Sequence, residues 1–221
     1  MEKHQNKIQT SETFLLSSIL TLSGGFQDAY TYVLRDEVFA NAQTGNVIFM
    51  SQHLMAGEWY KGVQYLLPIV AFTFGVLISE MIEHNYKKSK FHWRQIVVLL
   101  EVIGLLIVGF IPTQYNIIAT AIVSFTCAMQ VQAFRKVQGY AYASTMCIGN
   151  LRSGTSTLSV YLRDRKIETL KKALCYYGII FIFAIGAVLG GICSEILGLK
   201  AIWSSSLLLM IAFGLMIKKY R

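Results

Sequence analysis

The sequence predicts an all-α integral membrane protein, with six full transmembrane helices and two further polar segments that are interrupted or re-entrant. Three observations predict this class. Of the 221 residues, 54% are hydrophobic and only 14% are charged, whereas a soluble domain carries about a quarter charged residues. The apolar residues form long runs of bilayer-spanning length. The basic residues stand in short clusters between these runs.

Six apolar segments approach the roughly 20 residues that a helix needs to cross the hydrocarbon layer. In chain order these segments are Phe14–Leu34, Gly62–Ile82, Ile96–Pro112, Tyr115–Phe134, Ala173–Leu197 and Ala201–Ile217. Two other segments, Val38–Gly57 and Tyr140–Leu162, have almost no charge but carry many amide and hydroxyl side chains. These two polar segments are the parts of the chain whose membrane crossing needs an independent argument.

The distribution of lysine and arginine provides that argument. If both polar segments enter and leave on one side, 16 of the 20 basic residues lie on the side of the N-terminus and 3 on the other, with Arg152 inside a segment. If both segments cross fully, the division is 11 against 8. The positive-inside rule therefore favours six crossings, with both termini in the cytoplasm. The net charge of +8 is read as this orientation signal, so no nucleic-acid partner is expected.

The pattern of segments occurs twice in one polytopic domain covering residues 1–221. Residues of about 14–112 form the first repeat and residues of about 115–217 the second, with a period of about 104 residues that aligns Gly45-Asn46 with Gly149-Asn150. Each repeat has three full crossings, an odd number, so the second is inverted relative to the first. Gly45 and Gly149 are expected to supply the turn that interrupts each polar segment, and the asparagines to bond the freed backbone groups.

Two sets of motifs resemble a known family. The first set reads GxxDA, then F, then TGN, and lies in Gly25–Ala29, Val38–Phe39 and Gln43–Asn46. The second resembles MGxQxAxxR, then T, then TGxL, and lies in Met129–Arg135, Thr145 and Ile148–Leu151. These motifs are similar to those of the YoaK-like family, known as domain of unknown function 1275 or UPF0700. Gln130 and Ile148 depart from the family's usual Gly and Thr. The resemblance implies a bacterial multi-pass membrane protein and no particular substrate.

Asp28 is the most costly polar residue in the predicted spans, because a carboxylate at mid-membrane depth costs on the order of 2.5–3.5 kcal/mol. One interpretation is a proton, cation or substrate site, and the other is a structural acceptor that holds the neighbouring Gly45-Asn46 turn. We expect the two polar segments to meet near the bilayer midplane and to frame a polar site with Asp28. The candidate substrate-binding residues are Asp28, Gln43, Thr44, Asn46, Gln132, Asn150 and Arg152.

Three other features each have two interpretations. Arg152 is a candidate for an anionic substrate or simply a side chain that reaches the cytoplasmic surface. Glu101 is expected to extend toward Arg94 or the inner headgroups, with a proton relay as the alternative. The small pair Gly186–Gly190 favours close packing of another helix, either inside the molecule or in a homodimer.

The leading functional hypothesis is a small transporter or channel for an unidentified solute or ion, embedded in the lipid bilayer. A non-transporting scaffold or assembly factor is the alternative. An intramembrane enzyme is less favoured, since the sequence has no GxSG motif with a partner histidine and no HExxH motif. The four cysteines form no CxxC pair, so neither a metal site nor a cofactor is expected.

Overall fold

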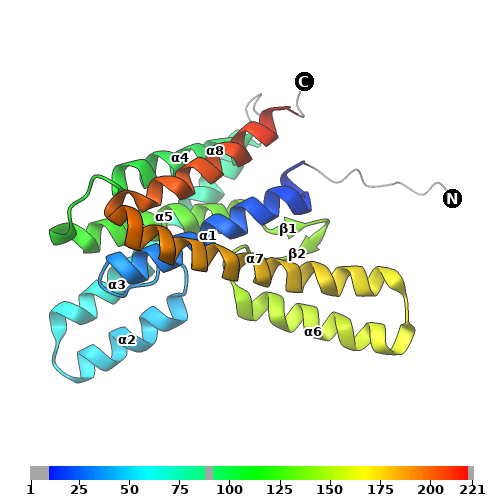
Figure 1. Cartoon of the computed structure of the whole chain (residues 1–221), viewed down its shortest axis with the longest axis horizontal. Helices are drawn as coiled ribbons and strands as arrows, with labels where there is room; N and C mark the ends of the chain where they lie inside the picture. Colours follow the sequence, from blue (N-terminus) through cyan, green and yellow to red (C-terminus); the bar gives the residue numbers. More distant parts are fainter. Residues whose placement is uncertain (1–9, 88–91, 219–221) are drawn as a thin grey trace.

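The computed structural model describes residues 10–87 and 92–218. Lys90, which the six-crossing topology places in the cytoplasm, lies outside the described residues. The fold is all-α apart from one small hairpin, which confirms the all-α part of the prediction (Figure 1). The helices are α1 (Phe14–Leu34), α2 (Gln43–Met55), α3 (Trp59–Tyr86), α4 (Trp93–Val108), α5 (Asn116–Ala133), α6 (Cys147–Asp164), α7 (Ile167–Leu197) and α8 (Ile202–Lys218). The strands β1 (Lys136–Val137) and β2 (Tyr140–Ala141) pair antiparallel between α5 and α6, a hairpin that the hydropathy pattern does not predict.

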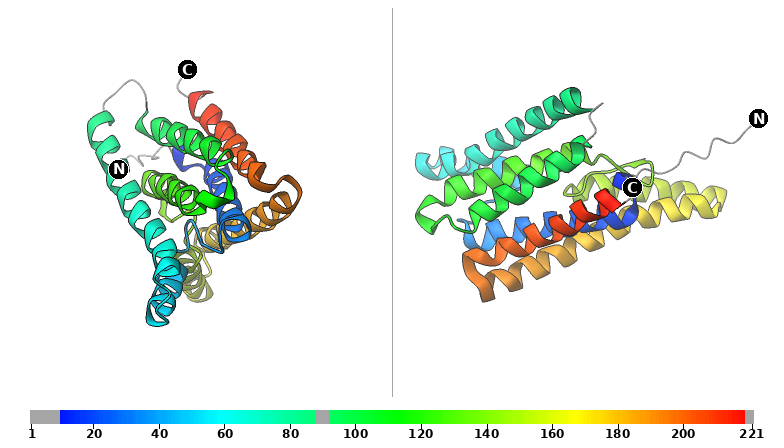
Figure 2. Two further views of the ribbon diagram at one scale, coloured as in Figure 1. Left: turned by 90° about the vertical axis from the view of Figure 1, so that its left-hand side faces the viewer. Right: turned by 90° about the horizontal axis from the view of Figure 1, so that it is seen from above.

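The long helices form one bundle in which α5 lies inside and α3 and α7 lie at opposite edges (Figure 2). In the most apolar stretch of the α5 region, 67% of the residues are buried. In the most apolar stretches of α3 and of the α7–α8 region, 22% of the residues are buried. Helix α1 packs along α7, and α3 packs along α5; α4 packs against α8. The start of α1 and the end of α8 lie at the same end of the bundle (Figure 1).

Glycines allow α1 and α7 to touch through their backbones. A Cβ atom added at Gly186 would lie 2.2 Å from the carbonyl oxygen of Leu22, and one added at Gly190 would lie 2.5 Å from that of Phe26. The pair Gly186–Gly190 is therefore used in packing inside the chain, as expected for small residues four apart on a membrane helix. The same device recurs between α3 and α5, where Gly75 faces the Phe125 carbonyl.

Apolar side chains also cover the outside of the bundle. On α7, Phe181, Val188 and Ile196 are 61–74% exposed, a surface that suits lipid and not water. Within the described residues, three helical stretches are long and apolar enough to cross a membrane: Trp59–Tyr86, Thr113–Ala133 and Ile167–Ile217. These features define a multi-pass helical membrane protein in contact with the bilayer.

The prediction that each polar segment is interrupted at its Gly-Asn pair is wrong. Helix α2 already begins at Gln43 and α6 at Cys147, so Gly45 and Gly149 are the third residues of regular helices. The non-helical backbone lies before each helix, and its positive φ angles are at Asp36, Glu37, Gln138 and Gly139. The breaks are therefore placed where the chain leaves α1 and α5, and not at Gly45 and Gly149.

Arg35 holds together one end of the bundle. Its guanidinium is fully buried and donates five hydrogen bonds: two to the Tyr30 hydroxyl, and one each to the Val108 carbonyl, the Ile111 carbonyl and Asn116 Oδ1, all between 2.8 and 3.2 Å. The planar fork of an arginine can serve several acceptors at once. This side chain thus joins the end of α1 to the end of α4 and the start of α5.

Candidate functional site

The extended chain before α2 is fastened to α1 at the depth of Asp28. Asp28 Oδ1 accepts the backbone N–H of Asn41 at 2.7 Å, and the Asn41 amide donates to the Gly24 carbonyl at 3.3 Å. Ser124 of α5 donates to the Ala40 carbonyl at 2.7 Å. Polar side chains from two helices thus satisfy the backbone groups of a non-helical segment, as irregular chain inside a membrane protein requires.

Asn46 holds this segment from the other side. Its amide accepts the backbone N–H of Phe39 at 3.1 Å and donates to the carbonyl of the same residue at 2.7 Å. The amide also donates to Gln43 Oε1 at 3.0 Å. Asn46 is fully buried and is the fourth residue of α2. Its role is therefore to fix this non-helical segment against the first turn of the helix.

Asn150 makes the same contacts in the second half of the chain. It is the fourth residue of α6, and its amide donates to the Ala143 carbonyl at 2.7 Å and accepts the Ala143 N–H at 3.5 Å. In both halves the asparagine lies seven residues after the residue that it holds. The prediction that these amides bond freed backbone groups is correct, although the groups belong to the non-helical segment before each helix and not to a turn at the glycine.

A cavity of about 900 Å³ lies between the starts of α2 and α6 and contains Asp28. From their starting points near this cavity, α2 and α6 run in opposite directions (Figure 1). The polar part of the lining comes from Asp28 and Asn41, from Gln43 and Thr44 at the start of α2, from Thr73 of α3, and from Thr145 and Cys147 at the start of α6. The apolar part comes mainly from Tyr32, Phe39, Ile69, Phe72 and Phe183.

The starts of both helices lack the usual side-chain caps. Neither Ala42 nor Met146, the residues at the two N-cap positions, accepts a hydrogen bond through its side chain from the first helical turn. The first N–H groups of a helix carry partial positive charge that is not used within the helix. Two such helix ends therefore border the cavity that holds the Asp28 carboxylate.

The seven predicted site residues fall into three groups. Asp28, Gln43 and Thr44 line the cavity. Asn46 and Asn150 do not line the cavity, but they bond the backbone of the non-helical segments before α2 and α6. Gln132 and Arg152 lie elsewhere: Gln132 donates to Glu80, and Arg152 is exposed. At the period of 104 residues Gln132 aligns with Asp28. In the fold, however, it lies on the face of α5 that meets α3.

Cys147 and Thr145 also line the cavity, although neither is among the predicted substrate-binding residues. Cys147 is half-buried at the first position of α6, and Thr145 packs its methyl group against Gly24 of α1. The available signal was Thr145 itself, which belongs to the second motif set. The extended path of the chain before α6, which brings it beside α1, was not visible in the pattern of hydropathy.

The expectation for Glu101 is wrong. Its side chain is fully buried and accepts a hydrogen bond from Gln27 Nε2 at 3.0 Å. Arg94, to which it was expected to extend, donates instead to the Ala133 carbonyl and to Ser11. Arg94 and Glu101 are seven positions apart, so at 1.5 Å of rise per residue they are separated by about 10 Å along α4. Glu101 therefore belongs to the interior of the bundle.

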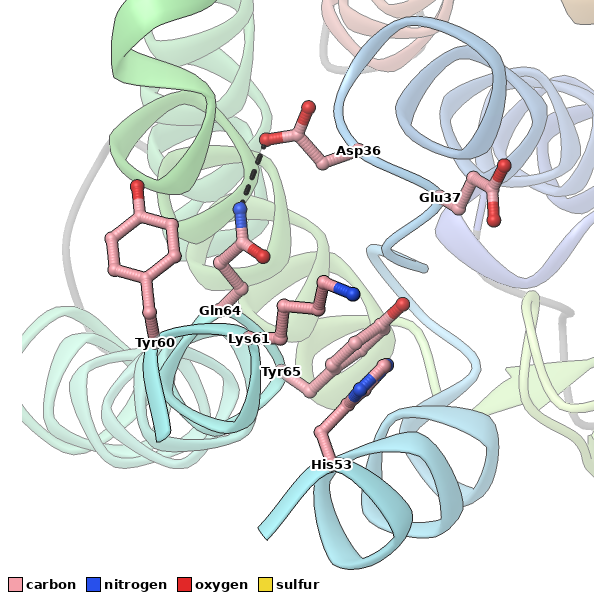
Figure 3. Close-up of a pocket in the computed structure, with 7 residues that line it drawn as sticks. All are labelled: Asp36, Glu37, His53, Tyr60, Lys61, Gln64 and Tyr65. Carbon is pink, nitrogen blue, oxygen red and sulfur yellow. Dashed lines mark hydrogen bonds between the residues drawn. The ribbon is translucent and has the colours of Figure 1, made fainter. Parts of the chain in front are cut away.

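A second pocket, of about 460 Å³, lies where the α1–α2 connection meets the start of α3. Figure 3 shows the Tyr65 ring lying against His53, with Lys61 extended beside them and Gln64 bonded to Asp36 at 3.2 Å. Hydrogen bonds from Lys61 and His53 hold the pKa of nearby Glu58 below its ordinary value. Glu58 pairs with Lys61 and His53, and Asp36 accepts hydrogen bonds from Gln64 and Asn116. Most polar groups of this exposed pocket therefore already have partners, so it is the weaker candidate.

Fold and site together define a multi-pass helical membrane protein with a partly polar cavity that opens to the surface. The sequence matches a family described as protein of unknown function DUF1275 over residues 16–215. The chain belongs to this family, which confirms the resemblance drawn from its motifs. No curated protein and no solved structure matches the chain.

Proposed function

We propose that the protein is a small transporter or channel that binds a small solute or ion in the cavity between the starts of α2 and α6. The observation that carries this proposal is the buried Asp28 carboxylate in a cavity of about 900 Å³. A cavity with mostly apolar walls and a few convergent polar groups is the usual form of a small-molecule site. A carboxylate at this depth in a bilayer is costly unless it has a function or a full set of partners.

An inverted repeat is the second part of the proposal, and the packing supports it. Exchanging α1, α2, α3 and α4 with α5, α6, α7 and α8 leaves the set of neighbours nearly unchanged: α1 packs on α7 as α5 packs on α3, α2 packs on α3 as α6 packs on α7, and α4 packs on α5 as α8 packs on α1. The matching asparagine contacts add to this symmetry. Transporters built in this way bind their substrates between the repeats.

The proposed topology has six crossings, made by α1, α3, α4, α5, α7 and α8, with both termini in the cytoplasm. Helices α2 and α6 each enter partway, from opposite faces. The α2–α3 and α6–α7 connections lie at opposite ends of the molecule (Figure 1), which supports this arrangement.

Thiol labelling in intact cells checks the topology. A cysteine in place of Glu58, in the α2–α3 connection, is expected to react with a membrane-impermeant reagent added outside. A cysteine in place of Arg165, in the α6–α7 connection, is expected to react only after the membrane is opened. Both residues are exposed, so accessibility differs by side alone. Labelling of both positions from one side would contradict the six-crossing proposal.

Cys147 offers a native probe of the cavity. We use a variant in which Cys147 is the only cysteine, with alanine at Cys127, Cys175 and Cys193. In nanodiscs, Cys147 is expected to react with a small hydrophilic methanethiosulfonate reagent, and a solute that occupies the cavity is expected to slow that reaction. A second variant that retains only Cys127, which is fully buried, is the matched control and should not react.

Asp28→Asn tests the role of the carboxylate. The amide keeps an oxygen that can accept the Asn41 N–H, so the fold is expected to be retained while the charge is lost. Solutes that protect Cys147, drawn from a panel of alkali cations, inorganic anions, amino acids and carboxylic acids, are then assayed for uptake into proteoliposomes. Asp28→Asn is expected to abolish that uptake, and Arg152→Gln, which is outside the cavity, is expected to preserve it.

Two results would count against transport. If Asp28→Asn takes up solute at the wild-type rate, Asp28 is only a structural acceptor for the extended segment. If no solute of the panel protects Cys147 or enters the vesicles, the scaffold or assembly function is favoured instead. Asp28→Leu separates folding from function, because it removes the acceptor of the Asn41 N–H and is expected to destabilise the protein by about 1–3 kcal/mol.

A further inference from the structure

A second polar cluster lies inside the bundle, away from the cavity. It consists of Ser23 and Gln27 of α1, Glu101 of α4 and Ser205 of α8, and all four side chains are fully buried. Gln27 Nε2 is at its centre, 3.0 Å from Glu101 Oε1, 3.0 Å from Ser23 Oγ and 3.2 Å from Ser205 Oγ. The two serine oxygens are 2.7 Å apart. None of the four residues lines the cavity.

The surroundings of Glu101 offer no compensating charge. Among the described residues Glu101 takes part in no ion pair, and its only hydrogen-bond donor is the neutral amide of Gln27. Its second oxygen, Oε2, is buried without a partner. The neighbouring apolar side chains include Val97, Val98 and Leu105, which are fully buried on the same helix. An ionised carboxylate in such a place loses its hydration and gains little in return, whereas the neutral acid loses far less.

The titratable side chains on the packed helices do not change this conclusion. Helix α5 contributes Cys127, whose thiol lies within electrostatic range of both Glu101 and Asp28. Helix α8 has no titratable side chain over residues 202–217, and α1 contributes Tyr30 together with Asp28 and Tyr32, which both line the cavity. The acidic and basic groups of α3, Lys61, Glu80, Glu83 and His84, line its two end pockets. Any charge carried by Asp28 or Cys127 is negative, and both would favour a proton on Glu101.

We propose that Glu101, with Gln27, Ser23 and Ser205, forms a proton-binding site in the core of the bundle, occupied at neutral pH. The ligand is a proton, bound to a carboxylate oxygen to give the neutral acid and released to give the carboxylate. The proposal concerns Glu101 alone and does not depend on transport through the cavity.

The Gln27 amide is suited to both states of the acid. Toward a carboxylate it presents its N–H₂ group, the orientation described above. Its own oxygen, Oε1, is buried and has no partner in that orientation. When the carboxyl is protonated, half a turn of the amide brings Oε1 to the centre of the cluster. There Oε1 can accept the carboxyl O–H and the hydroxyl of one of the two serines, Ser23 or Ser205. Proton binding is thus expected to be linked to rotation of one side chain.

Infrared spectroscopy of the full-length protein in nanodiscs tests the proposal, because a protonated carboxyl group has a carbonyl stretching band that a carboxylate lacks. Asp28 is also a buried carboxyl, so spectra are compared between Asp28→Asn and the double variant Asp28→Asn/Glu101→Gln at neutral pH. The proposal expects a band, sensitive to exchange into D₂O, that is present in the first and absent from the second. Glu83→Gln, which removes a carboxylate paired with Arg135 at 3.1 Å, should leave this band unchanged.

The absence of any Glu101-dependent band at neutral pH would overturn the proposal, because Glu101 would then be ionised. If Glu101→Gln does not fold, Gln27→Leu in the Asp28→Asn background provides the second measurement. That variant retains the acid but removes its hydrogen-bond partner, so the band is expected to persist and shift to higher frequency. A spectrum without a carboxyl band in that variant, or with an unshifted band, would contradict the site as described. Since the readout is spectroscopic, a failure of solute uptake would leave this result unaffected.

Discussion

Gly186→Ala is expected to destabilise the folded bundle strongly, because α1 and α7 approach through their backbones at this residue. The added Cβ would lie 2.2 Å from the Leu22 carbonyl oxygen and 3.0 Å from its carbon. Backbone atoms cannot rotate out of the way as a side-chain terminus can, so the two helices must separate along their length. Overpacking of a close-packed site costs about 1–3 kcal/mol, and contact with backbone places this variant at the upper end or above it.

Gly191→Ala on the same helix is the matched control. A Cβ at Gly191 meets nothing within 4 Å, and alanine is favoured over glycine in a helix by about 1 kcal/mol. The thermal midpoint of this variant should therefore equal or exceed that of the wild type. The measurement is thermal unfolding of the detergent-solubilised protein, followed by exposure of the buried Cys127 thiol to a fluorogenic maleimide. Equal midpoints for Gly186→Ala and Gly191→Ala would show that the helices are not held at backbone contact.

Arg35→Met is expected to have the second large effect. The substitution removes all five hydrogen bonds of the guanidinium and leaves the carbonyls of Val108 and Ile111 and the amide oxygen of Asn116 without this donor. Each buried acceptor without a donor costs about 1–3 kcal/mol. Methionine fills most of the volume of arginine, so the loss reports on hydrogen bonding more than on packing.

Arg35→Lys separates charge from geometry. It keeps the positive charge, but a single ammonium group cannot reproduce the planar fork that reaches three chain segments. Its thermal midpoint is expected to fall between those of the wild type and Arg35→Met. Lys200→Met, at an exposed cation stacked over Trp203, is the control and should change the midpoint little. A midpoint for Arg35→Met close to that of Lys200→Met would contradict the structural role assigned to Arg35.

The class of fold could be predicted from hydropathy because spanning length and apolar composition are imposed by the bilayer. The bounds of the elements were less predictable. Helix α3 runs from Trp59 to Tyr86, beyond the apolar segment Gly62–Ile82, since helices continue into polar flanks as long as their backbone bonds are satisfied. The small hairpin before α6 could not be predicted, because its two-residue strands are too short to show a periodicity.

The candidate site was only partly predictable for a related reason. Asp28 and the asparagines were found because polar groups in an apolar sequence are costly and therefore informative. The position of the breaks was not found, because Asn46 and Asn150 act on backbone seven residues earlier, a distance at which local sequence rules do not operate. Gln132, Arg152 and Glu101 were misplaced because the faces to which they point depend on which helices pack together, and no alignment within one sequence gives that.

The pairing of α1 with α7 has a consequence for biogenesis. Helix α1 ends at Leu34 and its backbone partner ends at Leu197, so most of the chain must be synthesised before the contact can form. At a translation rate of about 5–20 residues per second this interval is roughly 10–30 s. During that time the face of α1 that will contact α7, and the polar residues Gln27 and Asp28, lie in the membrane or the translocon without their final neighbours. A helix in the last third of the chain therefore completes the packing of one that is synthesised much earlier.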